Sequence, residues 1–328
     1  MTSAAPTVDA VVQAGGAHIP ELMGRLERRL REVAGGHGAE LARHGGETIA
    51  AGGKRLRPLL VFVAAGEGGD GAGEREGLLR AAVAVELVHS ATLVHDDVLD
   101  AAQLRRGRPT VVAEAGRSMA TATGDLLFSR AFAELAITGS AEAVRALSAA
   151  SSALALGELL QREDAFRPVT VERYLQRCEL KTARLFEAAC RLGALEGRRP
   201  AVAGELGAFG RRIGLAFQLL DDVLDVSGPA ERTGKTRGAD LLDGTVTLPL
   251  ILARQRDPEL AAVDIGAIAT PARAAEVCAR IEASGALVDA RVRALDLAAE
   301  AKAGLPELPA AQRGALELVA DGVVERYA

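Results

Sequence analysis

The chain has 328 residues, of which 49% are hydrophobic, and a formal net charge of −5 at pH 7. This is ample apolar material for a large buried core. The mild acidity, together with seven Phe, two Tyr, no Trp and no basic stripe, argues against a nucleic-acid partner.

Three features predict a cytoplasmic protein. Cys178, Cys190 and Cys278 are too few and too scattered for a disulfide framework and form no CxxC pair, so we expect reduced thiols. The first residues have neither the basic region nor the apolar region of a signal peptide. We find no run of 18 or more residues apolar enough to span a bilayer, so the protein is not expected to be an integral membrane protein.

Helical patterns fill the chain after a segment at residues 1–20 that we expect to be loosely ordered. Apolar residues recur at spacings of three and four over residues 76–100, 118–136, 170–195 and 201–225. Breakers rich in Gly, Pro or polar residues separate helical stretches at 66–73, 105–109, 163–168, 196–200 and 227–244. Thr170 is placed to cap the helix that follows it. Strand signals are almost absent, so residues 21–328 are predicted to form one all-α domain of ten or more helices around a central cavity.

The string DDVLD occurs twice, each time at the end of an apolar helix. The first copy contains Asp96, Asp97 and Asp100, and the second contains Asp221, Asp222 and Asp225. Residues i and i+4 of a helix lie on the same face, so the outer aspartates of each copy project together and repel. A hard divalent cation cancels this repulsion, and Mg²⁺ commonly bridges carboxylates to substrate phosphates. A solvated acidic face would explain one copy, but two copies favour a magnesium site that uses all six aspartates.

Both copies resemble the aspartate-rich motifs of the trans-isoprenyl diphosphate synthases, also called polyprenyl synthetases. The resemblance runs from about residue 50 to 253 and is closest to medium- and long-chain bacterial members. Further matching segments are Gly52-Gly53-Lys54-Arg55-Leu56-Arg57-Pro58, His89, Leu104-Arg105-Arg106-Gly107, Gly124-Asp125-Leu126-Leu127, Lys181-Thr182, Phe217-Gln218, Gly234-Lys235 and Thr247-Leu248-Pro249. The resemblance implies an isoprenoid-synthase helical bundle, about three Mg²⁺ ions per site and a homodimer. It also implies condensation of isopentenyl diphosphate with an allylic prenyl diphosphate.

Charge considerations assign the remaining site residues within this resemblance. The allylic diphosphate leaves with its electrons, and metal ions stabilise the charge that develops on it. Isopentenyl diphosphate must bind without ionising, so its site should use side-chain cations, for which the candidates are Lys54, Arg57, His89 and Arg106. By resemblance, the allylic diphosphate contacts Arg105, Lys181, Thr182, Gln218 and Lys235, of which Lys181 and Lys235 also belong to the catalytic set.

One aromatic side chain and one histidine also lie beside the motifs in the sequence. Phe217 could present its ring face to the carbocation, although a core Phe is an equal alternative. His95 is interpreted as structural. One residue departs from the family pattern, because Thr245 stands in the segment 240–249 where relatives often have a Lys that contacts diphosphate.

The growing chain should run along the helix that precedes Asp96. Thr92 and Ala91 lie four and five residues before this aspartate, Val88 lies two turns before it, and none is bulky. Each helical turn rises about 5.4 Å, comparable to one isoprene unit. Phe128 and Phe132 on the next helix could form a deeper floor, unless they are ordinary core residues. The prediction is a product longer than farnesyl.

Two competing interpretations come from other classes of protein. A class I terpene cyclase also has a DDxxD motif, but its second metal motif is normally of another type. A non-catalytic subunit of a heteromeric prenyl synthase typically loses the aspartate motifs, and both are intact here. Release of diphosphate that requires both substrates would discriminate a synthase from either alternative.

Overall fold

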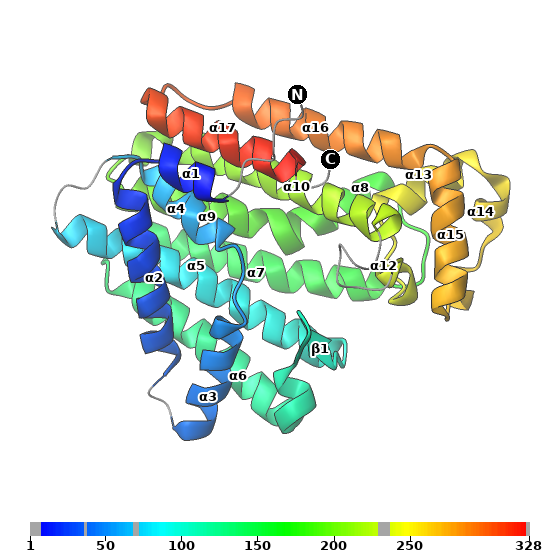
Figure 1. Cartoon of the computed structure of the whole chain (residues 1–328), viewed down its shortest axis with the longest axis horizontal. Helices are drawn as coiled ribbons and strands as arrows, with labels where there is room; N and C mark the ends of the chain where they lie inside the picture. The colour runs from blue at the N-terminus through cyan, green and yellow to red at the C-terminus, as the bar shows by residue number, and fades with distance from the viewer. Residues whose placement is uncertain (1–7, 36–37, 68–71, 229–236, 326–328) are drawn as a thin grey trace.

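The computed structural model describes residues 8–35, 38–67, 72–228 and 237–325, and these are almost entirely helical (Figure 1). The α-helices are α1 (Val8–Ala14), α2 (His18–Ala34), α3 (Ala39–Ala50), α4 (Leu56–Ala65), α5 (Ala72–Leu99), α6 (Val111–Ala136), α7 (Ala141–Asp164), α8 (Val171–Cys178), α9 (Arg184–Glu196), α10 (Ala203–Ser227), α12 (Ala239–Leu242), α13 (Leu248–Arg256), α14 (Pro258–Ala262), α15 (Pro271–Ala283), α16 (Ala286–Ala303) and α17 (Ala310–Glu325). The short elements are strands β1 (Leu104–Arg105) and β2 (Arg108–Pro109), a π-helix at Glu179–Ala183, and 3₁₀ turns at Pro200–Val202 and Ile265–Ala267. The all-α prediction is confirmed.

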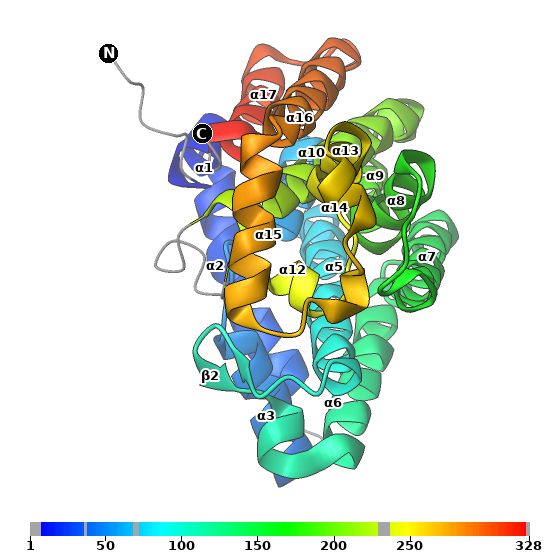
Figure 2. The ribbon, with the colours of Figure 1, turned by 90° about the vertical axis from the view of Figure 1, so that its right-hand side faces the viewer.

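Helix α5 is the centre of the fold. Residues 81–88 are all buried, so this part of the helix is covered on every side, as its nearly continuous apolar sequence requires. It packs against α4, α6 and α9, while α10 packs against α9 and α16. Figure 2 shows α5 in the middle of the molecule, with α2 on one side and α7 on the other. The first aspartate motif lies at the end of α5 and the second near the end of α10.

Two helices are long and apolar enough, by length and composition, to span a membrane. This corrects the expectation that no stretch of the chain would be. They are residues Arg75–Leu99 of α5 and Ala141–Asp164 of α7. The most apolar window of α5 is 78% buried within the fold, so its composition is that of a core helix. The window of α7 is only 39% buried, which leaves an apolar face on the surface.

The N-terminal expectation is also corrected. Residues 8–14 and 18–20 are helical rather than loosely ordered, and Val11 and Ile19 are buried. Helix α1 packs against α17, which joins the beginning of the described chain to its end. This pairing could not be read from either segment alone.

The predicted helix at 170–195 is interrupted where it reaches the site. Thr170 caps it as expected, because its side chain accepts a hydrogen bond from the Arg173 amide. The helix then widens into one π turn that contains Lys181 and Thr182 before α9 continues. Such π turns recur at functional sites. Gly157 of α7 packs against this turn so closely that a Cβ there would lie 2.5 Å from the Lys181 amide nitrogen.

The predicted loop at 105–109 forms a small hairpin. Strands β1 and β2 pair antiparallel, and the two residues between them, Arg106 and Gly107, have φ angles of 51° and 75°. Positive φ at both central positions defines the type I′ turn that matches strand twist. The turn therefore favours Gly107 at its second position and carries Arg106 at its first.

Glycine at position 210 allows α10 to lie directly against α9. An ideal Cβ at Gly210 would lie 2.4 Å from the Phe186 carbonyl oxygen, whereas a Cβ at Gly204 on the same helix would meet nothing within 4 Å. Gly210→Ala should therefore destabilise the fold by about 1–3 kcal/mol through overpacking. Gly204→Ala is the matched control and should be neutral or stabilise by up to about 1 kcal/mol. Urea unfolding of both variants tests this packing, and equal stability would contradict it.

Candidate active site

One cavity of about 790 Å³ is lined by side chains from segments far apart in the sequence, between Glu47 and Asp221. Its walls come from the end of α3, from the loop after it and the first residues of α4 (together residues 52–57), from α5, from the β1–β2 hairpin with the start of α6, and from α9 and α10. The sequence-predicted residues on its surface are Lys54, Arg57, His89, Asp97, Arg105, Arg106, Phe217 and Asp221. Since Asp97 and Asp221 belong to different copies of the DDVLD motif, both motifs reach the same space.

Arg57 is half-buried and carries a positive charge whose Nε is buried without a hydrogen-bond partner among the described residues. Its guanidinium lies 4.5 Å from the centre of the Phe186 ring. Burial lowers the pKa of Arg57 to about 10. The side chain is therefore still a cation at neutral pH, with a desolvated donor facing no acceptor. An anionic ligand would satisfy it.

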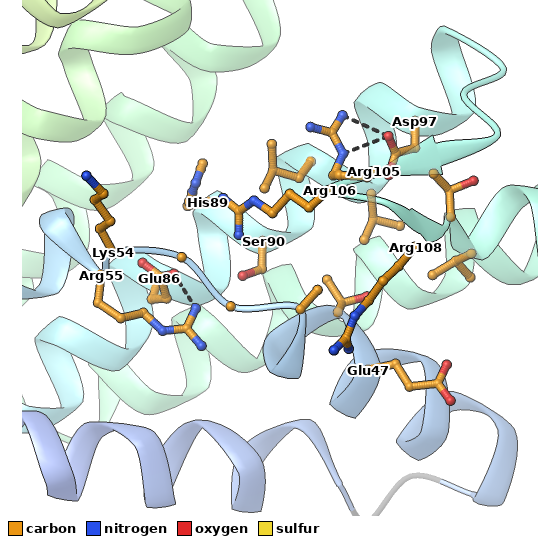
Figure 3. Close-up of a pocket in the computed structure, with 18 of the residues that line it drawn as sticks. Glu47, Lys54, Arg55, Glu86, His89, Ser90, Asp97, Arg105, Arg106 and Arg108 are labelled. Atoms are coloured by element: carbon orange, nitrogen blue, oxygen red, sulfur yellow. Dashed lines mark hydrogen bonds and ion pairs between the residues drawn. The ribbon is translucent and has the colours of Figure 1, made fainter. Parts of the chain in front are cut away.

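His89 lies among arginines. Burial, and then the charges of Arg57, Arg106 and Arg105, hold the pKa of His89 well below its usual range. The ring is therefore neutral in the ligand-free protein. Figure 3 shows Arg106 reaching from the hairpin toward His89. A bound anion would oppose the arginine charges and raise the pKa of His89.

Arg55 is a positioning residue that the sequence did not single out. It has a left-handed backbone with φ 48°, and it is buried. Its guanidinium donates to Glu27 and Glu86 at 2.7 Å each and to the Ile49 carbonyl at 2.8 Å. These bonds hold the loop from which Lys54 and Arg57 arise. The motif spacing alone did not distinguish Arg55 from its two neighbours, since all three are basic.

The middle aspartate of each motif is already held by protein donors. Arg105 grips Asp97 with Nε at 2.8 Å and Nη2 at 2.7 Å (Figure 3). The buried Asp222 accepts from the Tyr174 hydroxyl at 2.6 Å and from Gln218 Nε2 at 2.8 Å. Both oxygens of Asp222 accept a hydrogen bond, whereas Arg105 contacts only Oδ1 of Asp97, so protein donors occupy Asp222 more completely than Asp97.

The outer aspartates occupy different surroundings. Burial raises the pKa of Asp96, the charge of Lys181 lowers it, and the charges of Glu158 and Asp100 raise it, so that together they bring it to about 6. Asp100 is half exposed and accepts from Arg162 at 2.9 Å. A raised pKa means that the surroundings of Asp96 disfavour its negative charge. A divalent cation would stabilise that charge, and carboxylate oxygens are ligands that suit Mg²⁺.

Helix α7 supplies two polar side chains that the sequence did not predict. Lys181 Nζ donates to Glu158 at 2.5 Å and to Gln161 at 3.2 Å. The signal that could have found them is their position in α7, because Glu158 is the only charged residue between Arg145 and Arg162. A charge in an otherwise apolar helix usually has a specific partner.

A buried hydrogen-bond chain connects the π turn to the second motif. Thr182 donates to Gln218 Oε1 at 2.8 Å, and Gln218 in turn donates to Asp222, which also accepts from Tyr174. Thr182 and Gln218 were predicted to contact the allylic diphosphate. Here they orient Asp222, and the fully buried Tyr174 completes the chain.

The predicted chain-length residues lie apart from this cavity. Val88 and Ala91 are fully buried, and Thr92 is half-buried with its hydroxyl donating to the His89 carbonyl at 2.8 Å. Phe128 and Phe132 are half-buried on α6, and the His95 ring stacks on Phe128 with 5.7 Å between centroids. None of these six residues lines the cavity described above.

The segment at residues 227–249 contains further residues that the sequence singled out. Gly234 and Lys235 lie outside the described residues. The Thr245 amide donates to the Asp240 carbonyl at 2.8 Å, so Thr245 belongs to the turn that follows α12.

Stability should depend on pH through the buried aspartates. Burial raises the pKa of Asp222 to about 7, whereas an unfolded aspartate titrates near 3.9. Between these values the folded state binds more protons than the unfolded state, so stability falls as pH rises from about 4 to about 7. Asp222→Asn should remove part of this fall and, at pH 8, stabilise the metal-free protein by on the order of 1 kcal/mol or more.

The measurement is urea unfolding of metal-free protein at pH 5 and pH 8. Asp321→Asn, which removes an exposed carboxylate of α17 paired with Lys302, is the matched control and should leave the pH dependence unchanged. If Asp222→Asn had the same pH dependence as wild type, Asp222 would not titrate abnormally.

Comparison with known families matches residues 39–281 to the family described as polyprenyl synthetase. Heptaprenyl diphosphate synthase component 2 of Geobacillus stearothermophilus is 40% identical over 290 residues, which cover 86% of this chain and 88% of that protein. Among solved structures, a polyprenyl synthase from Caulobacter crescentus complexed with calcium and isoprenyl diphosphate has a TM-score of 0.91 and 37% identity, covering 99% of this chain and all of the other. A decaprenyl diphosphate synthase from Rhodobacter capsulatus has a TM-score of 0.88 and 33% identity over 98% of this chain and 99% of the other.

Proposed function

Because the chain belongs to the polyprenyl synthetase family, we propose that it extends an allylic prenyl diphosphate with isopentenyl diphosphate, giving an all-trans polyprenyl diphosphate and free diphosphate. The chain is a prenyltransferase, which leaves the class I terpene cyclase without support. The observation that carries the proposal is the cavity that joins Asp97 and Asp221 of the two motifs to a cluster of side-chain cations.

Isopentenyl diphosphate would occupy the cationic half of this cavity. Support comes from Arg57, whose buried Nε awaits an acceptor, and from the neutral His89 among three arginines. Lys54 is exposed at the rim, and the Arg106 guanidinium lies against the bare backbone of Gly53, where a Cβ would be 3.2 Å from its Nη1. No metal is needed here, because three cations, Lys54, Arg57 and Arg106, and the neutral His89 would face one diphosphate that must not leave.

The allylic diphosphate would lie between the two aspartate motifs. The donor set fits Mg²⁺, because Asp96, Asp100, Asp221 and Asp225 are oxygen ligands in pairs one helical turn apart, and the resemblance implies about three ions. When bound, Mg²⁺ would neutralise the charge that develops on the departing diphosphate. Lys181, Arg105 and Lys235 would hold the same diphosphate, and Asp97 and Asp222 would position Arg105 and Gln218. Phe217, whose ring lies 5.8 Å from that of Phe186, would face the carbocation.

We further propose a product longer than farnesyl. Three small or mid-sized residues, Val88, Ala91 and Thr92, precede the first motif, and the relatives named above include heptaprenyl and decaprenyl synthases. The His95–Phe128 stack holds α5 and α6 together beside Asp96, so Phe132, one turn further along α6, lies deeper in the bundle. Its ring would form the floor of the channel.

A homodimer with one catalytic domain per chain completes the proposal, and this domain includes α1 and all of α2 rather than beginning at residue 21. The surface of α7 supports it, because the exposed residues of this helix between Arg145 and Arg162 are uncharged. They are Ser148, Ala149, Ser152, Ala155, Leu156 and Leu159. A second copy would cover this face in a cytoplasmic enzyme that is not inserted in the membrane. The Geobacillus relative is named as a component of a synthase, so a heteromer is the competing arrangement.

Loss of either outer aspartate should abolish turnover without unfolding the protein. Asp96→Asn or Asp221→Asn should reduce diphosphate release by about 100-fold or more, the scale seen when one group that stabilises developing charge is removed. Release should require both substrates and Mg²⁺, and a chelator should stop it. Asp321→Asn is the matched control and should retain full turnover. Near-normal turnover in either motif variant would contradict the metal assignment.

Substitutions in the cationic half should separate the two substrates. Arg57→Ala or His89→Ala removes one charge-assisted hydrogen bond worth about 1.5–3 kcal/mol, so the KM for isopentenyl diphosphate should rise about 10- to 150-fold. Lys235→Ala should instead raise the KM for the allylic substrate. Initial rates with each substrate varied in turn provide the measurement. Equal effects on both KM values in every variant would mean that the two subsites are not distinct.

Chain-length variants should change the product before they change the chemistry. Thr92→Phe adds bulk at a half-buried position one turn before Asp96 and should shorten the product, while Phe132→Ala should lengthen it. Ala91→Phe should also shorten the product, but full burial of this site predicts an overpacking cost of about 1–3 kcal/mol. Chromatography of the products is compared with thermal stability. An unchanged product distribution in all three active variants would show that the chain does not follow α5.

A further inference from the structure

Three potential metal ligands gather where α3 meets the start of α6, away from the aspartate motifs. His44 and Glu47 are three residues apart on one face of α3, and Glu114 lies in the first turn of α6. One ligand atom from each of the three lies within 4.8 Å of the others. Glu47 and Glu114 also line the edge of the active-site cavity (Figure 3 labels Glu47).

His44 provides the observation that points to a ligand. Its side chain is completely buried, and its Nδ1 has no hydrogen-bond partner in the described parts of the chain. The nearest carboxylate oxygen that faces Nδ1 is Glu47 Oε2, 3.7 Å away, which is too long for a hydrogen bond. A buried ring nitrogen left in this state is costly, and imidazole is the commonest metal ligand in proteins.

In this structure the positive charge of Arg43 lies among the three side chains of this cluster. Its Nη1 lies 3.6 Å from Glu47 and 3.8 Å from Glu114, and its Nη2 lies 3.0 Å from His44 Nε2. A third carboxylate, Glu40, lies 3.5 Å from Nη2. All three carboxylate contacts are long, and the side chain is 49% exposed, so these ion pairs are weak. Arg43 can therefore rotate into solvent when a stronger cation arrives.

The proton on His44 makes the two cations mutually exclusive. Donation from Arg43 requires a lone pair on Nε2, which leaves the proton on Nδ1. Coordination through Nδ1 requires the opposite tautomer, with an N–H at Nε2. Glu40 Oε2 lies 4.0 Å from Nε2 on the same helix and is exposed, so it can approach to accept that proton. A carboxylate that orients a ligating histidine in this way is the common arrangement in metal sites.

We propose that His44, Glu47 and Glu114 form a second divalent-cation site, distinct from the aspartate motifs and suited to Zn²⁺ or another ion that binds imidazole. Imidazole nitrogen and carboxylate oxygen are both ligands that Zn²⁺ accepts, and three protein ligands would leave a fourth position open, whereas Mg²⁺ prefers oxygen alone. The ion would join α3, which leads into the 52–57 loop, to α6, which follows the β1–β2 hairpin. It would therefore clamp together the two segments that carry the cations of the cavity.

The experiment titrates the full-length, metal-stripped protein with Zn²⁺ in a large excess of Mg²⁺, which occupies oxygen-only sites. Bound zinc is counted after gel filtration, and the melting temperature is recorded with and without Zn²⁺. We expect one Zn²⁺ per chain and a rise in melting temperature. The double variant Asp96→Asn/Asp221→Asn should bind the same amount, and loss of zinc from it would overturn the proposal.

Ligand variants give the second arm. Glu114→Gln alters a partly exposed side chain and should still fold, and it should weaken zinc binding by more than the roughly 10- to 100-fold that loss of an outer-shell partner costs. His44→Gln should behave alike. Retention of one tightly bound Zn²⁺ in Glu114→Gln would overturn the proposal even if His44→Gln did not fold.

Arg43→Met is the variant that separates a metal site from an ordinary network of ion pairs. Removing the competing guanidinium should tighten zinc binding and enlarge the thermal shift. If the cluster only held Arg43, the same substitution would leave zinc binding unchanged or weaker, and that result would overturn the proposal.

Discussion

Repulsion between carboxylates in a partly dry interior is the constraint to which the surroundings of both aspartate motifs respond. Burial is the largest cause of the raised pKa of Asp96 and of Asp222, and the charge of a neighbouring carboxylate raises each of them too. The fold answers in two ways. It gives Asp97 and Asp222 short hydrogen bonds from side chains, at 2.6–2.8 Å. It gives Asp100 and Asp225 longer ones, from Arg162 at 2.9 Å and from the Asp240 amide at 3.3 Å.

The same cavity also contains an excess of positive charge. Arg57 lies beside Phe186 with a buried, unmatched donor, and the arginines around His89 keep its ring neutral. The pocket thus brings the cations around His89 together with Asp97 and Asp221, and Arg105 pairs with Asp97 within it. Close helix packing fixes the elements around the pocket, because Gly210 lets α10 lie against α9 and Gly157 lets α7 lie against the π turn. Unmatched charges in this pocket lower the free energy of unfolding of the ligand-free enzyme.

Much of the fold and part of the site follow from local sequence. Helices α5 and α10, the cap at Thr170 and the Gly107 turn obey rules that involve residues at most four apart. The two DDVLD copies were recognisable for the same reason, since i,i+4 spacing on a helix places Asp96 beside Asp100 whatever surrounds them. The cationic residues of the cavity also came from sequence, through the motifs in which they stand.

Other features were decided by tertiary packing. Tyr174 and Asp222 are 48 residues apart, Arg55 and Glu86 are 31 apart, and His44 and Glu114 meet from different helices. A hydrogen bond between distant residues depends on how two helices cross and how closely they approach, and the apolar periodicity of each helix specifies only which face is buried. The sequence by itself therefore determined the helices, the family and the presence of two acidic motifs. Only the packed structure decided which aspartates are held by protein, because burial and donor geometry exist only once the helices are together.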